Sequence, residues 1–202
     1  MNLGEYGVLF VTVVAIVALL VASPALSRML VYPRTEFFTE MGMLGPNHMA
    51  EGYPHNITRS QTYGVYLTLS NHLGYSAYYV VEVKFRNSTQ SAPYDFGPIS
   101  NRTPSSLPSL YNVSAFVADE DSWELPLSFS FNYINPTSST VQMRSLRLND
   151  VNLNMSSCSI AWSSQRREFD GHLFFELWIY NSTASVFQYH ARWVGLTLNM
   201  TV

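Results

Sequence analysis

The sequence has almost no cysteine and almost no lysine. Cys158 is the only cysteine, so an intramolecular disulfide and a four-cysteine zinc site are both excluded. We interpret it as a small buried residue within a strand. Lys84 is the only lysine, and charged residues make up 12% of the chain, where a soluble domain carries roughly 25%. Because no basic run exists, nucleic acid is not an expected partner.

Recognisable catalytic and cofactor motifs are also missing. The sequence contains no Gly-x-Ser-x-Gly elbow, no phosphate-binding loop and no dinucleotide-binding fingerprint. Serines are abundant, but no spacing singles out a Ser-His-Asp triad. We therefore predict a non-enzymatic protein that needs no cofactor.

A long apolar run without charge lies near the start of the chain. Residues 7–26 form a run of 20 residues, and at about 1.5 Å each they would span the roughly 30 Å hydrocarbon core of a bilayer. Tyr6 and Tyr32 flank the run, as interfacial aromatic residues do. A cleaved signal peptide would have a positively charged start and a shorter apolar core. We therefore predict that residues 1–34 are a retained anchor that contacts lipid through residues 7–26.

Two signals disagree on the side of the membrane where the rest of the chain lies. Arg28 and Arg34 follow the apolar run and favour the cytoplasmic side by the positive-inside rule. Against this stand seven Asn-x-Ser/Thr sequons, where chance would give roughly three. Because large domains translocate largely regardless of nearby charge, we place the domain outside the cytoplasm on a single-pass cell-membrane anchor. We predict N-linked glycosylation at Asn56, Asn87, Asn101, Asn112, Asn154, Asn181 and Asn199.

Residues 35–202 have the pattern of an all-β domain. Apolar and polar residues alternate, as in half-buried strands, in five segments: residues 65–70, 79–86, 125–133, 173–180 and 194–201. Shorter strand candidates lie at residues 37–44, 141–148 and 157–162, and Asn149-Asp150 is typical of a turn. The proline-rich residues 91–108 are expected to form a long loop. Roughly seven to nine strands predict an immunoglobulin-like antiparallel β-sandwich preceded by one transmembrane helix.

A series of short motifs begins directly after the anchor. It comprises Thr35-Glu36-Phe37, Leu44-Gly45-Pro46, Ala50-Glu51-Gly52-Tyr53-Pro54, Asn56-Ile57-Thr58, Ser70-Asn71-His72, Gly74 and residues 78–83. This series resembles the archaeal membrane family DUF1616, with Leu73 where that family usually has glutamate. The resemblance implies an extracytoplasmic immunoglobulin-like domain of an archaeal membrane protein, and it implies no activity because the family is uncharacterised. Since the motifs begin within ten residues of the apolar run, we expect a short tether.

Two clusters could bind cations. His48, Glu51 and His55 offer imidazole and carboxylate ligands for a loop-based metal site, although the glycines and prolines around them rule out a helical His-Glu-x-x-His arrangement. The acidic residues between Asp119 and Glu124 offer oxygen ligands for calcium, without the glycine pattern of an EF-hand. We favour loop packing for the first cluster and a solvated loop for the second, and predict no bound metal.

Aromatic residues are the strongest surface signal, with 13 Tyr, 12 Phe and 4 Trp. Phe174, Trp178 and Tyr180 alternate with an apolar stripe, so they are predicted to form an exposed interaction surface, unless both faces of a central strand are covered. We predict a membrane-anchored, non-enzymatic structural or accessory subunit of an archaeal cell-envelope or membrane protein assembly, with other subunits as partners. A glycan-binding module for surface polysaccharide or glycoprotein assembly is the alternative, and the loop-based metal site is the second.

Overall fold

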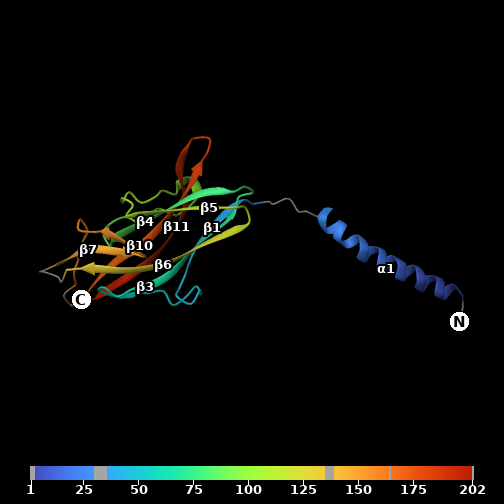
Figure 1. Ribbon diagram of the computed structural model, residues 1–202, viewed down its shortest axis with the longest axis horizontal. Coiled ribbons are helices and arrows are strands. Elements are labelled where there is room, and N and C mark those ends of the chain that lie inside the picture. Colours follow the sequence, from blue (N-terminus) through green and yellow to red (C-terminus); the bar gives the residue numbers. More distant parts are fainter. Residues whose placement is uncertain (1–2, 30–35, 135–138, 164, 202) are drawn as a thin grey trace. The chain divides into compact units, whose positions relative to one another are not determined.

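A computed structural model of the protein describes residues 3–29, 36–134, 139–163 and 165–201 (Figure 1). Contacts between residues divide the chain into two compact units, Met1–Phe37 and Phe38–Val202, which are considered separately. The predicted boundary between the anchor and the domain, at residues 34 and 35, lies outside the described residues, as do Tyr32 and Arg34.

The first unit contains a single helix, α1 (Leu3–Met29), with Pro24 inside it. Its segment Tyr6–Pro24 is 19 residues long, and none of this segment is buried within the protein. The one hydroxyl in the middle of the segment is satisfied internally, because Thr12 donates to the Val8 carbonyl at 2.9 Å. By length and composition α1 can therefore cross a membrane, which fits the predicted anchor.

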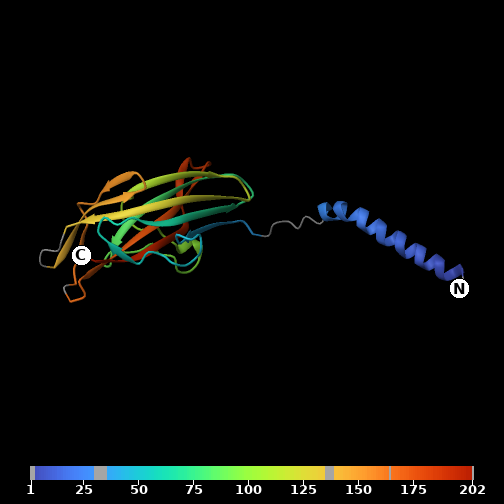
Figure 2. The ribbon, with the colours of Figure 1, turned by 60° about the horizontal axis from the view of Figure 1, so that its bottom comes forward.

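The second unit is a sandwich of two β-sheets, stacked face to face in Figure 2. One sheet has the order β1-β3-β6-β7-β8, with β9 also paired to β7, and the other has the order β2-β11-β10-β4-β5. All pairs are antiparallel except β2 with β11. The first sheet comprises β1 (Phe38–Leu44), β3 (Tyr63–His72), β6 (Asp121–Tyr133), β7 (Thr140–Leu148), β8 (Val151–Asn154) and β9 (Ser159–Ala161). The second comprises β2 (Asn56–Thr58), β4 (Ala77–Asn87), β5 (Tyr111–Val117), β10 (Glu168–Asn181) and β11 (Val186–Thr201).

The predicted all-β sandwich preceded by one apolar helix is confirmed. Eleven strands occur among the described residues, which exceeds the predicted number because several are only three or four residues long. Asn149 adopts a positive φ of 50° in the predicted turn between β7 and β8. Its side-chain oxygen accepts the Ser128 N–H at 2.7 Å, so the turn is tied to the neighbouring strand β6.

Aromatic rings fill the space between the two sheets. Phe129 and Phe131 of β6 are fully buried, and Phe131 lies 5.4 Å from Phe85 of β4 between ring centroids. Tyr133 meets Phe169 of β10 edge to face at 5.0 Å. Burial of each such side chain contributes roughly 1.5–3 kcal/mol, and burial raises the pKa of Tyr133 to about 12. Many of the aromatic residues of the sequence therefore lie in the core.

The long loop predicted at residues 91–108 is present between β4 and β5. It contains one short 3-10 helix, η1 (Ile99–Asn101), and a bridge between Tyr94 and Thr103. Ser105 within this loop is buried and bonded to strand β10. The loop therefore lies over the outer face of the five-stranded sheet.

Candidate functional site

The sandwich has an open seam between β1 and β11. Strand β1 is the edge of its sheet, and the outer side of β11 is covered only by the short strand β2. That pairing joins Asn56–Thr58 to Asn199–Thr201. Before Asn199, this side of β11 has no strand partner within the part of the chain that the structure describes. Unpaired strand edges of this kind bind extended polypeptides.

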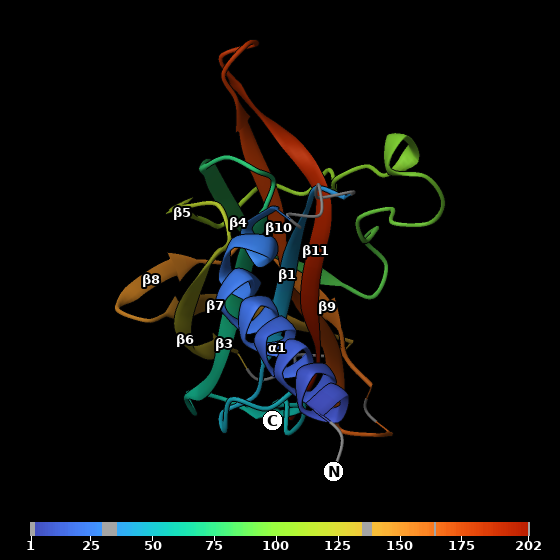
Figure 3. The ribbon, with the colours of Figure 1, turned by 90° about the vertical axis from the view of Figure 1, so that its right-hand side faces the viewer.

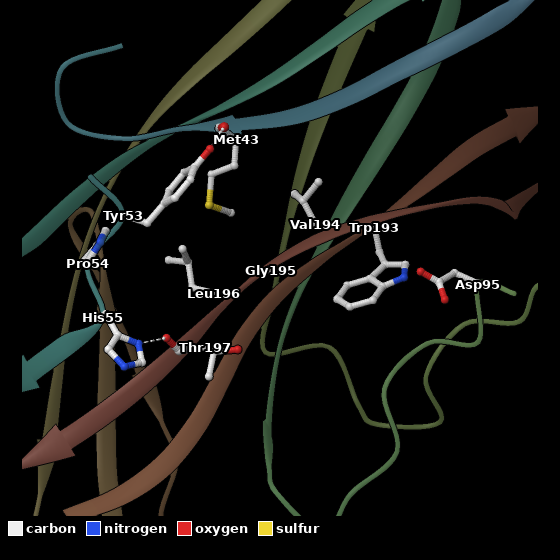
Figure 4. Close-up of a pocket in the computed structure, with 10 residues that line it drawn as sticks. All are labelled: Met43, Tyr53, Pro54, His55, Asp95, Trp193, Val194, Gly195, Leu196 and Thr197. Atoms are coloured by element: carbon white, nitrogen blue, oxygen red, sulfur yellow. Dashed lines mark hydrogen bonds between the residues drawn. The ribbon is translucent and has the colours of Figure 1, made fainter. Parts of the chain in front are cut away.

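A pocket of about 520 Å³ lies in this seam (Figure 4). Its lining comes from four separate segments, namely Met43, residues 53–55, Asp95 and residues 193–197. Met43 and Leu196 are nearly buried and provide an apolar floor that is continuous with the core. The remaining lining combines apolar residues such as Val194 with the polar residues His55, Asp95 and Thr197, so the pocket suits a ligand with both kinds of surface.

Tyr53 and His55 close one end of the seam. The Tyr53 hydroxyl donates to the Met43 carbonyl of β1 at 2.7 Å. The His55 carbonyl accepts the Asn199 N–H at 2.7 Å, and His55 Nδ1 lies 3.0 Å from the Thr197 carbonyl oxygen. These contacts join the segment before β2 to both sheets and hold the His55 ring at the rim.

A buried polar network closes the other end. His190 Nε2 lies 2.8 Å from the Thr39 hydroxyl, which lies 3.1 Å from the Tyr79 hydroxyl. Tyr79 in turn donates to the side-chain oxygen of Asn71 at 3.1 Å. Burial is the main cause that lowers the pKa of His190 to about 4, and the positive charge of the nearby Arg192 guanidinium is the second cause. The imidazole is therefore neutral at neutral pH, as its position between the two sheets requires.

Aromatic packing forms the wall of the pocket on the outer face of the five-stranded sheet. Trp193 meets Phe174 edge to face, with 6.2 Å between ring centroids. Phe174 is only 1% exposed, so its predicted place on an exposed surface is wrong. Gly195 makes room for it, because a Cβ there would lie 2.8 Å from the Phe174 Cβ. At Phe174 the alternative prediction holds, in which both faces of a central strand are covered.

Trp178 and Tyr180 differ in their surroundings. Trp178 is partly buried and meets Tyr189 edge to face at 5.7 Å, and its indole N–H has no hydrogen-bond partner among the described residues. Tyr180 is 40% exposed. Of the predicted stripe, only Tyr180 is therefore exposed.

A buried ion pair fastens the loop at residues 91–108 to the sheet. The Lys84 ammonium donates to Glu176 at 2.7 Å and to the Ser105 carbonyl at 3.2 Å, and it lies 3.0 Å from Glu82. The other Glu176 oxygen accepts the Ser105 N–H at 2.7 Å. Lys84 and Glu176 are both buried, and these bonds compensate for the water that each charge has lost.

The three residues of the predicted loop-based metal site, His48, Glu51 and His55, have separate surroundings. His48 stacks on Tyr66 with 3.6 Å between ring centroids, and its Nε2 lies 3.2 Å from Glu124. His55 borders the pocket, and Glu51 is exposed. Among the described residues, no group of three or more His, Cys, Asp or Glu could hold a metal ion. The loop-based metal site therefore has no geometric support.

The acidic cluster occupies the turn between β5 and β6 and the first residues of β6. Asp119 accepts the Gly74 N–H at 2.8 Å, and Glu120 lies 3.0 Å from His72 Nδ1. Gly74 has a positive φ of 81°, as expected for the turn between β3 and β4. These carboxylates thus join two neighbouring turns.

The seven sequons differ in accessibility. Asn56, Asn101, Asn112 and Asn154 are exposed, whereas Asn87, Asn181 and Asn199 are partly buried. Asn199 lies within β11 and donates to the Asn56 side chain at 3.2 Å. By exposure, the structure therefore divides the predicted glycosylation sites into four open ones and three partly buried ones.

The pocket residues Met43, Tyr53, Asp95 and Trp193 were not predicted as a site. They come from strands and loops far apart in sequence, and no motif joins them. Figure 4 places His55 and Asp95 at opposite ends of the pocket. A concave lining that combines apolar and polar side chains suits ligand binding.

Comparison with known proteins gives one family match. The family described as "Domain of unknown function (DUF1616)" matches residues 33–148, which is more than half of the chain. No curated protein matches the sequence. Solved structures with some similarity include a β-glucosidase from Listeria innocua in complex with glucose, at 9% identity and a TM-score of 0.37. That match covers 85% of this chain and 17% of the β-glucosidase chain.

A second solved structure is the ASH/PapD-like domain 7 of human CEP192. It is 10% identical with a TM-score of 0.31, and the match covers 85% of this chain and 92% of that domain. Likenesses this weak carry no functional argument.

Proposed function

This chain belongs to the DUF1616 family, and from that premise we propose that it is a membrane-anchored, non-enzymatic accessory subunit of an archaeal cell-envelope assembly. Helix α1, which is long and apolar enough to cross a bilayer, supports the anchor. The observation that carries the proposed role is the open edge of β11 with its apolar-floored pocket. The domain lies outside the cytoplasm and binds a partner subunit through this seam.

The partner contributes an extended polypeptide segment. The Thr197 carbonyl and the Asn199 N–H both point to the β2 side of β11, as their bonds to His55 show. Because alternate residues of a strand direct their backbone groups to the same side, the N–H and carbonyl of Gly195 also face the seam. A strand added there would gain backbone hydrogen bonds, while Met43 and Leu196 would receive its side chains.

Photo-crosslinking in native membranes tests this role. A photoreactive amino acid replaces the exposed Thr197 at the pocket rim, and the matched control replaces the fully exposed Asp150. Irradiation should give a discrete cross-linked protein from position 197 and none from position 150. Equal cross-linking from both positions, or none from 197, would contradict the proposal.

A glycan is the second candidate ligand, because the same pocket presents Trp193, Tyr53 and the Asp95 carboxylate. Sugars stack on aromatic rings and donate hydrogen bonds to carboxylates. The full chain in detergent should then bind specific glycans on an array, and Asp95→Asn should weaken that binding. Trp123→Phe, remote from the pocket lining, is the control. An array without any bound glycan removes this candidate.

A further inference from the structure

Exposed apolar side chains gather at one end of the sandwich. We call this set the aromatic tip, and it comprises Phe38, Tyr75, Tyr78, Phe116, Tyr180 and Val186, which are between 40% and 72% exposed. Strand register places them at the same end of the sandwich, because Phe38 lies opposite His72 at the end of β3, and Tyr78 lies opposite Phe116. Figure 3 shows the β10–β11 hairpin, which carries Tyr180 and Val186, extending beyond the neighbouring strands.

Two members of the tip, Tyr78 and Tyr180, form a ring cluster with the neighbouring Phe187. The Tyr78 ring lies 5.3 Å from Phe187 and 6.4 Å from Tyr180 between centroids. Tyr180 and Phe187 are themselves 5.3 Å apart, in an edge-to-face arrangement. Single exposed apolar residues are ordinary on protein surfaces, whereas contiguous ones mark a surface that another phase or molecule covers.

The chain from the anchor joins the domain at this end. Residues 30–37 are the eight residues between the end of α1 and Phe38, the first residue of β1. Eight residues span at most about 28 Å when fully extended. The aromatic tip is therefore the tethered end of the domain.

The sequons concentrate away from the tip. Asn87 is the last residue of β4, which starts beside the tip at Ala77, and Asn199 lies near the end of β11, opposite Asn56. Asn181 is the exception, and its side-chain oxygen accepts the N–H groups of Thr183 at 2.9 Å and Ala184 at 3.1 Å. The domain is thus apolar at its tethered end and open to glycosylation toward the other.

We propose that the aromatic tip lies in the headgroup region of the bilayer that α1 crosses, which rests on the proposed anchor. Tyrosine suits this region because its ring is apolar and its hydroxyl remains hydrated. Three tip residues are tyrosines, and Phe38, Phe116 and Val186 supply apolar contact. The adjoining carboxylates of Asp119 and Glu120 in the β5–β6 turn, and of Asp121 at the start of β6, would be repelled by an anionic surface, so the headgroups bound are net neutral.

Spin-label accessibility on the full chain in phosphatidylcholine vesicles tests this placement. In a Cys158→Ser background, nitroxide labels are attached at Phe116→Cys in the tip and, as the matched control, at the fully exposed Asp150→Cys. Collisions with oxygen, which concentrates in lipid, relative to an aqueous nickel chelate should be severalfold higher at position 116. Tyr75→Ser combined with Val186→Ser should lower that ratio at position 116 and leave position 150 unchanged.

The outcomes separate the tip from the anchor. Protein that does not float with the vesicles contradicts the anchor itself, whatever the labels report. Protein that floats, with position 116 as aqueous as position 150, keeps the anchor and overturns the tip proposal.

Discussion

Lys84 is buried and His190 is partly buried, and the domain tolerates both polar side chains because each has specific partners. The Lys84 ammonium has three oxygen atoms within 3.2 Å, two from carboxylates and one from the loop. His190 remains neutral and lies against the Thr39 hydroxyl. In both cases the cost of burial is offset by specific contacts, so removing or charging one partner should lower stability.

Replacement of the only lysine should be strongly destabilising. Lys84→Met leaves the Glu176 carboxylate buried without its nearest cation, which costs about 3–5 kcal/mol. Urea denaturation of the detergent-solubilised chain measures the loss. Glu176→Leu added to Lys84→Met should recover much of it, since no unpaired charge remains. A Lys84→Met variant as stable as wild type would show that the pair does not hold the loop.

His190 should make the protein less stable in mild acid. The unfolded imidazole titrates near 6.5 and the folded one near 4, so the unfolded state binds the extra proton between these values. The stabilisation is complete above pH 6.5 and is lost as the pH falls toward 4, by about 3 kcal/mol. Denaturation at pH 7 and pH 4.5, compared with the uncharged His190→Gln variant, isolates this component. An equal pH dependence in both proteins would refute it.

At the scale of elements, the local alternation of apolar and polar residues predicts strands well. It predicts poorly which strand faces are covered by other parts of the chain. The segments around Val65, Val81 and Phe129 alternate as expected because one face of each strand meets the core. Alternation alone also placed Phe174 at the surface, and there it failed. Trp193 and the distant loop at residues 91–108 cover that face, and a pattern within β10 carries no information about either. The pocket was missed for the same reason.

Gly195 should be intolerant of a side chain. Alanine there would bring its Cβ within 2.8 Å of the Phe174 Cβ and 3.1 Å of the Leu173 carbonyl oxygen. Gly195→Ala should therefore cost about 1–3 kcal/mol and lower the melting temperature. Gly64→Ala is the matched strand control, because its nearest contact would be an ordinary 3.8 Å. Similar melting temperatures for the two variants would argue against close packing at Gly195.

On the scale of the whole molecule, sequence and structure agree on an apolar helix followed by a β-sandwich. The helix and the strands were predictable because hydropathy over twenty residues and the alternation within a strand are local signals. The two ends of the domain differ, with an aromatic tip at one end and most sequons elsewhere, and this difference depends on strand register. It became visible only when residues such as Phe38 and Phe116 were placed at the same end.

Glycosylation should follow accessibility. We expect sugars on the open sequons Asn56, Asn101, Asn112 and Asn154, and an unmodified Asn199, whose side chain is partly buried against Asn56. Glycopeptide mass spectrometry on protein from native membranes measures occupancy site by site. Sugar on Asn199 with none on the four open sites would contradict the division drawn from the fold.

The central claim is an extracytoplasmic domain on a retained anchor, and cysteine accessibility tests it most directly. In a Cys158→Ser background, Asp150→Cys places one thiol at a fully exposed position of the domain, and Asn2→Cys places one before the apolar run. Intact cells are treated with a membrane-impermeant maleimide and their membranes are washed at alkaline pH. Labelling of position 150 before lysis, of position 2 only after lysis, and retention of both in the washed membrane is the predicted result. Labelling of position 150 only after lysis, or its release by the wash, would contradict the account.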